Sequence, residues 1–258
     1  MPHQSPLGLR WLKAGLLSLA CCCAAPWALA ADNNATPPSA APPAYKLTTG
    51  LYNSQGGDAP KAQALDVNLR HSSDIGNVWL AHYAPPQQEQ AQTRLGWDRS
   101  YSVSALRIAP SLQLATGGAW NSSLSVETGD TWYAGVGLGR TNLRDSFSLN
   151  FDPNDSLTLS GGYRWHESES LGFMLVRDNR LHTDQQHLHL IYRTPLPQGH
   201  RLTVDVLFKT GLVDDQPIAR TGLALTYDWP RYFVRVAYDP QVNFTAQNML
   251  RLVLGTRF

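Results

Sequence analysis

Cysteine is scarce in this sequence, and charge of one sign does not dominate. The chain of 258 residues has three cysteines, Cys21, Cys22 and Cys23, all near the N-terminus. Its 21 Lys and Arg residues nearly balance its 20 Asp and Glu residues, which gives a net charge of +1. The composition therefore excludes a disulfide-rich scaffold. It offers no strongly basic character for nucleic acid, so we expect no nucleic-acid partner.

Long apolar runs are also missing. Outside the N-terminus, no stretch reaches the roughly 18 apolar residues that a transmembrane helix needs. This excludes a helical membrane protein with several spans. It does not exclude a membrane β-barrel, because the strands of such a barrel alternate apolar and polar residues.

The first 30 residues have the pattern of a secretory signal. Arg10 and Lys13 precede the apolar stretch 14–25, and Ala28-Leu29-Ala30 offers small residues for cleavage after Ala30. Cleavage there would leave a mature chain without cysteine, and lipidation at Cys21 is the alternative. Residues 31–44 contain four prolines, which predicts a disordered, Pro-rich lead-in to one folded domain over 45–258.

From Tyr45 onward, residue character alternates with period two over segments of about nine to eleven residues, which indicates β-strands. In the last segment Leu250, Leu252 and Leu254 share one face, while Arg251 and Val253 share the other. We find no convincing helix-period segment in the mature chain. Such strands suit either a soluble β-sandwich or a membrane barrel.

Three features favour the barrel: heavily charged polar faces, strands long enough for a tilted bilayer crossing, and aromatic residues near strand ends. We therefore predict an all-β fold, a transmembrane antiparallel up-and-down β-barrel of about 12–14 strands. The expected membrane girdle consists of Trp97, Trp120, Trp165, Tyr192, Tyr227, Trp229, Tyr232, Tyr238 and Phe258.

Turn residues divide the domain into fourteen candidate strands. They cover 45–53, 62–71, 77–85, 91–99, 104–115, 119–127, 131–139, 157–166, 169–177, 185–195, 201–211, 219–228, 232–240 and 248–258. A fifteenth candidate at 146–151 is assigned to a loop, because a barrel with both termini on the periplasmic side needs an even count. The longer connections are expected on the side of the membrane opposite the periplasm. They cover 54–61, 141–156, 178–184, 212–218 and 241–247.

The signal and the last strand together resemble those of a known class of proteins. The signal, the cysteine-free mature chain and a last strand ending in Leu252-x-Leu254-x-Thr256-x-Phe258 are similar to those of Gram-negative bacterial outer-membrane β-barrel proteins of the porin-like class. The resemblance identifies no particular family. It implies location in the bacterial outer membrane, contact with outer-membrane lipid, and recognition by the barrel-assembly machinery through the C-terminal strand ending at Phe258.

The predicted inward faces carry more cations than anions. The cations are Lys46, Arg70, Arg94, Arg107, Arg164, Arg193, Lys209, Arg235, Arg251 and Arg257, and the anions are Asp66, Asp98, Glu127, Asp205, Asp228 and Asp239. Because an excess of one charge in a narrow channel sets its selectivity, our first hypothesis is a small porin-like channel for small solutes, anions included. In the alternative, these charges only pair across the lumen and hold the wall together.

Gly135, Gly137 and Gly139 recur with period two, so they form one inward strip that would leave room for a solute. The alternative is that these glycines only relieve crowding in the barrel.

Two other functions remain open. An outer-membrane lipid hydrolase could use His71 as base and Ser73 as nucleophile, although the predicted topology puts this turn at the periplasmic end. A structural barrel of an envelope or polysaccharide-export system needs neither chemistry nor conduction. His187 and His189 share a face but have no fixed third ligand, so we expect neither a metal site nor a cofactor.

Overall fold

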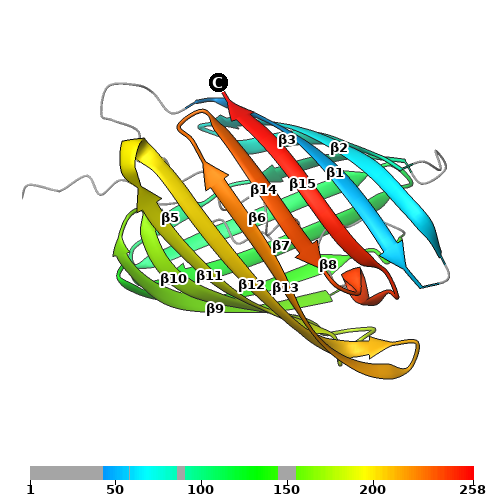
Figure 1. The fold of residues 1–258 in the computed structure, drawn as a ribbon. Coiled ribbons are helices and arrows are strands. Elements are labelled where there is room, and N and C mark those ends of the chain that lie inside the picture. Colours follow the sequence, from blue (N-terminus) through cyan, green and yellow to red (C-terminus); the bar gives the residue numbers. More distant parts are fainter. Residues whose placement is uncertain (1–42, 58, 86–90, 145–154) are drawn as a thin grey trace, which may run out of the picture.

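Alternating side chains build a wall of antiparallel strands that curls into a closed barrel (Figure 1). The computed structural model describes residues 43–57, 59–85, 91–144 and 155–258. The strands are β1 (Tyr45–Gly56), β2 (Ala59–Ser73), β3 (Gly76–Ala84), β4 (Gln92–Asp98), β5 (Tyr101–Val103), β6 (Leu106–Ala115), β7 (Ala119–Thr128), β8 (Trp132–Thr141), β9 (Asp155–His166), β10 (Glu169–Asp178), β11 (Gln186–Leu196), β12 (His200–Val213), β13 (Gln216–Asp228), β14 (Tyr232–Asp239) and β15 (Asn248–Arg257).

Two pairings determine how the barrel closes. β1 pairs with β15 along its whole length, and β4 pairs with β6. The short β5 continues the line of β4, because Asp98 of β4 lies opposite Ser111 of β6 and Tyr101 of β5 lies opposite Ile108. β4 and β5 therefore share one place in the wall, and the barrel has 14 strands. This confirms the predicted all-β, antiparallel up-and-down barrel.

Both ends of the folded domain lie at one end of the barrel, where the backbone N–H of Tyr45 donates to the carbonyl of Phe258 at 2.8 Å. We call this the termini end and the other the distal end. The predicted signal over 1–30 and residues 31–42 of the lead-in lie outside the described residues. So does the candidate strand at 146–151.

The predicted connection at 212–218 is wrong, since β12 and β13 continue to a two-residue turn and extend past their neighbours at the distal end (Figure 1). Asp214 and Asp215 take left-handed φ values of 49° and 61°, which matches the turn type that suits the twist of a hairpin. The predicted connection at 54–61 is too long for the same reason, because β1 ends at Gly56 and β2 begins at Ala59.

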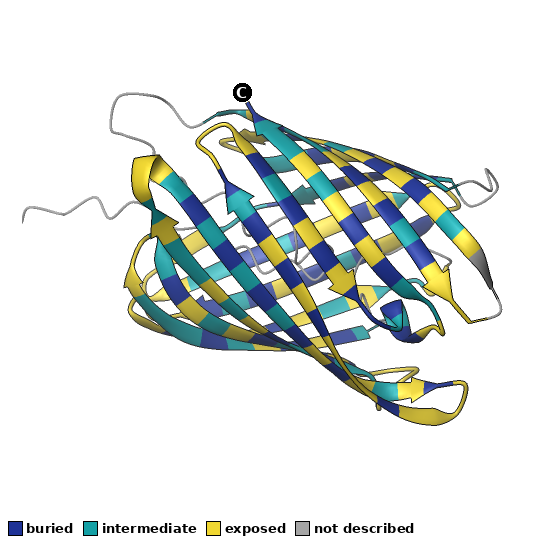
Figure 2. Cartoon of the chain, in the orientation of Figure 1, coloured by how far each residue is buried: buried dark blue, intermediate teal, exposed yellow. Residues whose placement is uncertain are grey.

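Burial alternates along every long strand (Figure 2). The outward side chains include a band of exposed leucines and valines, among them Leu65, Leu69, Leu80, Leu95, Leu124, Val136, Leu159, Leu225, Val236, Leu252 and Leu254. The inward side chains are mostly buried and mostly polar. Such a pattern suits a barrel whose outer surface contacts lipid. Within the described ranges, no helix is long and apolar enough to span a membrane.

Aromatic side chains gather at the termini end of the wall. Trp97, Trp165 and Tyr227 are each the last residue but one of their strand, and Trp229 and Tyr232 bound the β13–β14 turn. Tyr192, near the end of β11, and Phe258, just after β15, belong to the same end. Trp120 and Tyr238 are at the distal end. The placement is that of two aromatic rows, and their role as a membrane girdle stays a prediction.

Candidate functional site

The candidate site is the charged lumen. Every predicted pore-lining cation and anion lies on the inward side of its strand, where most of these side chains are buried. Arg107, Arg164 and Arg193 are more exposed than the others. Their role in conduction stays a prediction, but the structure places all of them along one surface.

Ion pairs near β2–β4 span two strands. Arg70 of β2 donates to Asp98 of β4 at 2.7 Å, and Asn77 of β3 donates to the other carboxylate oxygen at 2.7 Å. Arg94 of β4 is hydrogen-bonded to Asp66 of β2. These contacts tie β2 to β4 across the inward face of β3.

Two buried aspartates each bind two cations near β12–β15. Asp239 accepts from Lys209 at 2.5 Å and from Arg251 at 3.2 Å. Asp228 accepts from Arg257 at 2.6 Å and from Arg201 at 3.4 Å. Because each carboxylate neutralises one charge and contacts two, the clusters keep a net positive charge.

Glu127 and Asp205 are arranged in a similar way. Glu127 binds Arg107 at 2.7 Å and Arg164 at 2.9 Å, and the Arg164 guanidinium lies 3.7 Å from the centre of the Tyr133 ring. Asp205 binds the His189 Nδ1 at 2.9 Å and lies 3.7 Å from Arg235. Overall, six lumenal carboxylates contact eight arginines and one lysine. The structure therefore contains both predicted features: paired charges that hold the wall together and an excess of cations.

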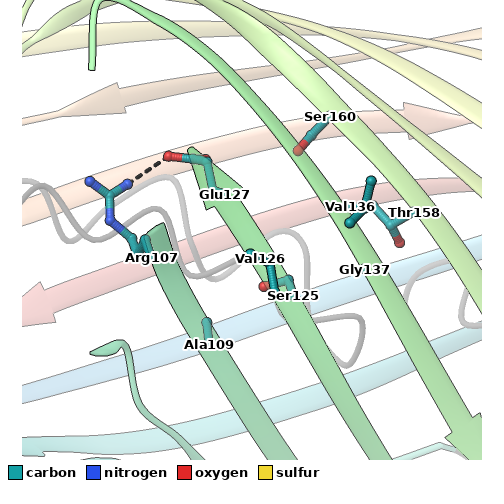
Figure 3. Close-up of a pocket in the computed structure, with 9 residues that line it drawn as sticks. All are labelled: Arg107, Ala109, Ser125, Val126, Glu127, Val136, Gly137, Thr158 and Ser160. Atoms are coloured by element: carbon teal, nitrogen blue, oxygen red, sulfur yellow. Dashed lines mark hydrogen bonds and ion pairs between the residues drawn. The ribbon is translucent and has the colours of Figure 1, made fainter. Parts of the chain in front are cut away.

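Side-chain size differs between the two sides of the lumen. Around β1, β3, β14 and the loop after it, the buried side chains are bulky and include Tyr52, Trp79, Tyr83, Phe233 and Phe244. Across β6–β9 most of them are small, namely Ala109, Ser111, Ser123, Ser125, Gly135, Gly137, Ser156 and Thr158, and the larger ones are Gln113, Asn121, Glu127 and Tyr133. A pocket lies over this small-residue wall, and its lining includes Arg107, Ser125, Glu127, Gly137 and Ser160 (Figure 3).

Some lumenal residues were missed by the sequence analysis. Arg201 faces inward on β12, and its position two residues before Thr203 on the same face could have identified it. Inward aromatic residues could not be identified from alternation alone, since Trp79 and Tyr83 look like outward girdle residues. The structure shows their partner in one case: Trp79 lies directly opposite Gly96, and its ring covers that glycine.

The candidate hydrolase residues are on the outer face at the termini end. The His71 ring stacks on Tyr45 at 4.6 Å, and the Ser73 hydroxyl donates to the carbonyl of Gly76 at 3.2 Å. Among the described contacts, no hydrogen bond joins the two side chains. His187 and His189 do share an inward face, with ring centres 6.0 Å apart. In the described part of the chain, no three His, Cys, Asp or Glu side chains gather as a metal site would require.

No protein-family model and no curated protein sequence matches the chain. Among solved structures, the outer membrane protein Omp33 of Acinetobacter baumannii aligns with a TM-score of 0.55 at 10% identity, over 84% of this chain and 99% of that one. A variant of the Rh. blastica porin aligns with a TM-score of 0.46 at 10% identity, over 83% and 99%. With its closed 14-strand wall and apolar outer band, the chain has the fold of a porin-like bacterial outer-membrane β-barrel.

Proposed function

We propose that this barrel is a small porin-like channel of the bacterial outer membrane that passes small solutes and prefers anions. The observation that carries the proposal is the lumenal charge. In the described ion pairs six carboxylates contact nine cations, and Arg193, Lys46 and the carboxylate of Asp178 also lie inward, so cations exceed carboxylates by four. Charged walls of low dielectric raise the local concentration of ions of the opposite sign.

The difference between the two sides of the lumen supports a path that is off-centre. Most of the bulky rings and ion-pair clusters occupy the side of β1–β4 and β12–β15, while glycine, serine and threonine line most of β7–β9, with Tyr133 and the Glu127–Arg164 pair as the exceptions. A solute would therefore pass along the small-residue wall, beside Arg107, Glu127 and Arg164. Such a narrow path implies a low conductance, and hydroxyl groups along it can hydrogen-bond to a polar solute.

Single-channel recording tests the proposal. The full chain would be expressed in a Gram-negative host, purified from the outer-membrane fraction and inserted into a planar bilayer under a salt gradient. We expect small, steady open events whose reversal potential reports a preference for chloride over potassium. Cation preference would overturn the anion selectivity. A barrel that is folded and inserted but does not conduct would overturn the channel function. It would favour the structural barrel, which the dense ion pairing in the lumen also supports.

Export and assembly belong to the same proposal. The signal would be cleaved after Ala30, the apolar band would contact outer-membrane lipid, and the termini end would face the periplasm. Phe258 is suited to recognition by the barrel-assembly machinery, because it is 60% exposed and its ring stacks on that of Tyr45 at the rim, with ring centres 5.7 Å apart.

Removal of Phe258 is therefore expected to reduce the amount of barrel in the outer membrane severalfold, with little change in the stability of the barrels that do assemble. The amount of folded barrel would be measured in outer-membrane fractions, because unheated folded barrels migrate differently from unfolded chains in detergent gels. Its stability would be measured as the temperature at which this difference in migration is lost. Leu225→Ala is the control, since it shortens an outward side chain of β13, outside the last strand. An equal loss for the two variants would contradict recognition of the terminal aromatic.

A further inference from the structure

We propose that Arg193 and Thr203, flanked by Arg164 and Arg201, form a binding site for a small oxyanion, a phosphate or carboxylate group, just inside the termini end of the lumen. The inference deepens the proposed channel function, because it names the chemical class of solute and the place where the wall holds it.

Strand register places the site on one level of the wall. Arg164 of β9 lies opposite Ser170 of β10, Ser170 lies opposite Arg193 of β11, and Arg193 lies opposite Thr203 of β12. The row continues through Thr226 of β13 to Arg235 of β14. The row thus consists of three guanidinium and three hydroxyl groups, and all of them can donate hydrogen bonds.

Two neighbouring donors on this level lack an acceptor. In the part of the chain that the structure describes, the buried Nε of Arg193 and the buried Oγ1 of Thr203 have no hydrogen-bond partner. Among the described residues, Arg193 forms no ion pair, whereas the ion pairs of the other lumenal arginines are 3.7 Å long or shorter. A buried polar group without a partner costs free energy, and a charged one costs more. Two such groups directly opposite each other on adjacent strands therefore indicate a missing acceptor.

The charges around Arg193 do not supply that acceptor. Its electrostatic neighbours are Arg201, Tyr133, Asp205 and Arg164. Arg164 is bound to Glu127 and also donates to the carbonyl of Asp130 at 3.1 Å, and Arg201 shares Asp228 with Arg257. Asp205 is bound to His189. Among the described residues, these carboxylates are already bound to other groups, while Arg201 and Arg164 act on Arg193 as like charges. A bound anion would relieve that repulsion.

The donor geometry favours an oxyanion over a halide. A guanidinium presents N–H groups in a planar fork that matches two oxygens of a carboxylate or phosphate, and a threonine hydroxyl donates to a third. Inorganic phosphate and acetate are therefore suitable probes, and chloride at equal ionic strength is the reference.

The test uses the detergent-purified barrel, made from the full chain, in isothermal titration calorimetry. We expect saturable binding of phosphate, weakened about tenfold in Arg193→Gln and less in Thr203→Val, as loss of hydrogen bonds to a charged group predicts. Arg193→Lys should bind with intermediate affinity, because it keeps the charge and loses the fork. Arg231→Gln, an exposed arginine in the β13–β14 turn, should bind as the unaltered protein does.

The outcomes separate this site from channel activity. A silent barrel that binds phosphate through Arg193 would retain the site and overturn the channel. A conducting barrel that binds no phosphate or acetate, or binds them equally after Arg193→Gln, would overturn the site and retain the channel. Should Arg193→Gln fail to fold, Thr203→Val decides, because it is nearly isosteric and keeps every charge: unchanged binding in that variant would overturn the site.

Discussion

Asp239→Asn is expected to lower the free energy of unfolding of the barrel by about 3–5 kcal/mol, the range for breaking a buried ion pair on one side. The side chain of Lys209 is completely buried, and its Nζ lies 2.5 Å from Asp239. Arg251 contacts the other oxygen of the same carboxylate at 3.2 Å. Neutralising Asp239 therefore leaves two buried cations side by side without their shared counter-charge.

The effect should also reach the connection between β14 and β15. Lys209 donates to the carbonyl of Gln241 at 3.1 Å and lies 5.6 Å from the centre of the Phe244 ring, so it links β12 to that connection at the distal end. Urea unfolding in detergent, followed by tryptophan fluorescence, would measure the loss. Asp184→Asn, in an exposed loop, is the control. A loss below about 1 kcal/mol, as for exposed ion pairs, would mean that water screens this cluster.

The sequence predicted the wall of the barrel well, because a lumen and a lipid face impose period two on every strand. The β9 segment was predicted at 157–166 and spans Asp155–His166, and β14 was predicted at 232–240 and spans Tyr232–Asp239. The predicted strand ends were wrong where strands extend beyond the apolar outer band. Asp214 and Asp215 have the composition of a loop, but they form a tight turn. The pairing of β12 with β13 therefore continues up to Val213 and Gln216, on either side of that turn.

Alternation also assigned the inward charges to one face, but it could not pair them. Arg70 and Asp98 are 28 positions apart and lie on strands separated by β3. Their contact depends on the stagger between strands, which is set when the barrel closes and which no local pattern encodes. The same holds for Arg193. That it has no carboxylate partner among the described residues is visible only once the neighbouring carboxylates have been assigned to other groups.

Gly137→Trp is expected to reduce the conductance of the channel by more than half while the barrel still folds. Gly137 faces inward in the middle of β8, opposite Ser125 of β7 and Thr158 of β9. A Cβ at this position would lie 3.4 Å from the Cβ atoms of both residues, so the wall can accept a side chain with small adjustments. The indole would then project over the small-residue wall, which is the proposed path, and narrowing a pore lowers its conductance.

The next residue supplies a matched control, because period two turns it to the opposite face. Leu138 is 63% exposed on the outer surface, so Leu138→Trp adds the same ring on the lipid side of the same strand. We expect single-channel recordings of Leu138→Trp to match those of the unaltered protein. Equal conductance in Gly137→Trp and Leu138→Trp would place the path elsewhere in the lumen. A block in Gly137→Trp alone would locate the path beside β8, where Ser125 and Thr158 flank the glycine.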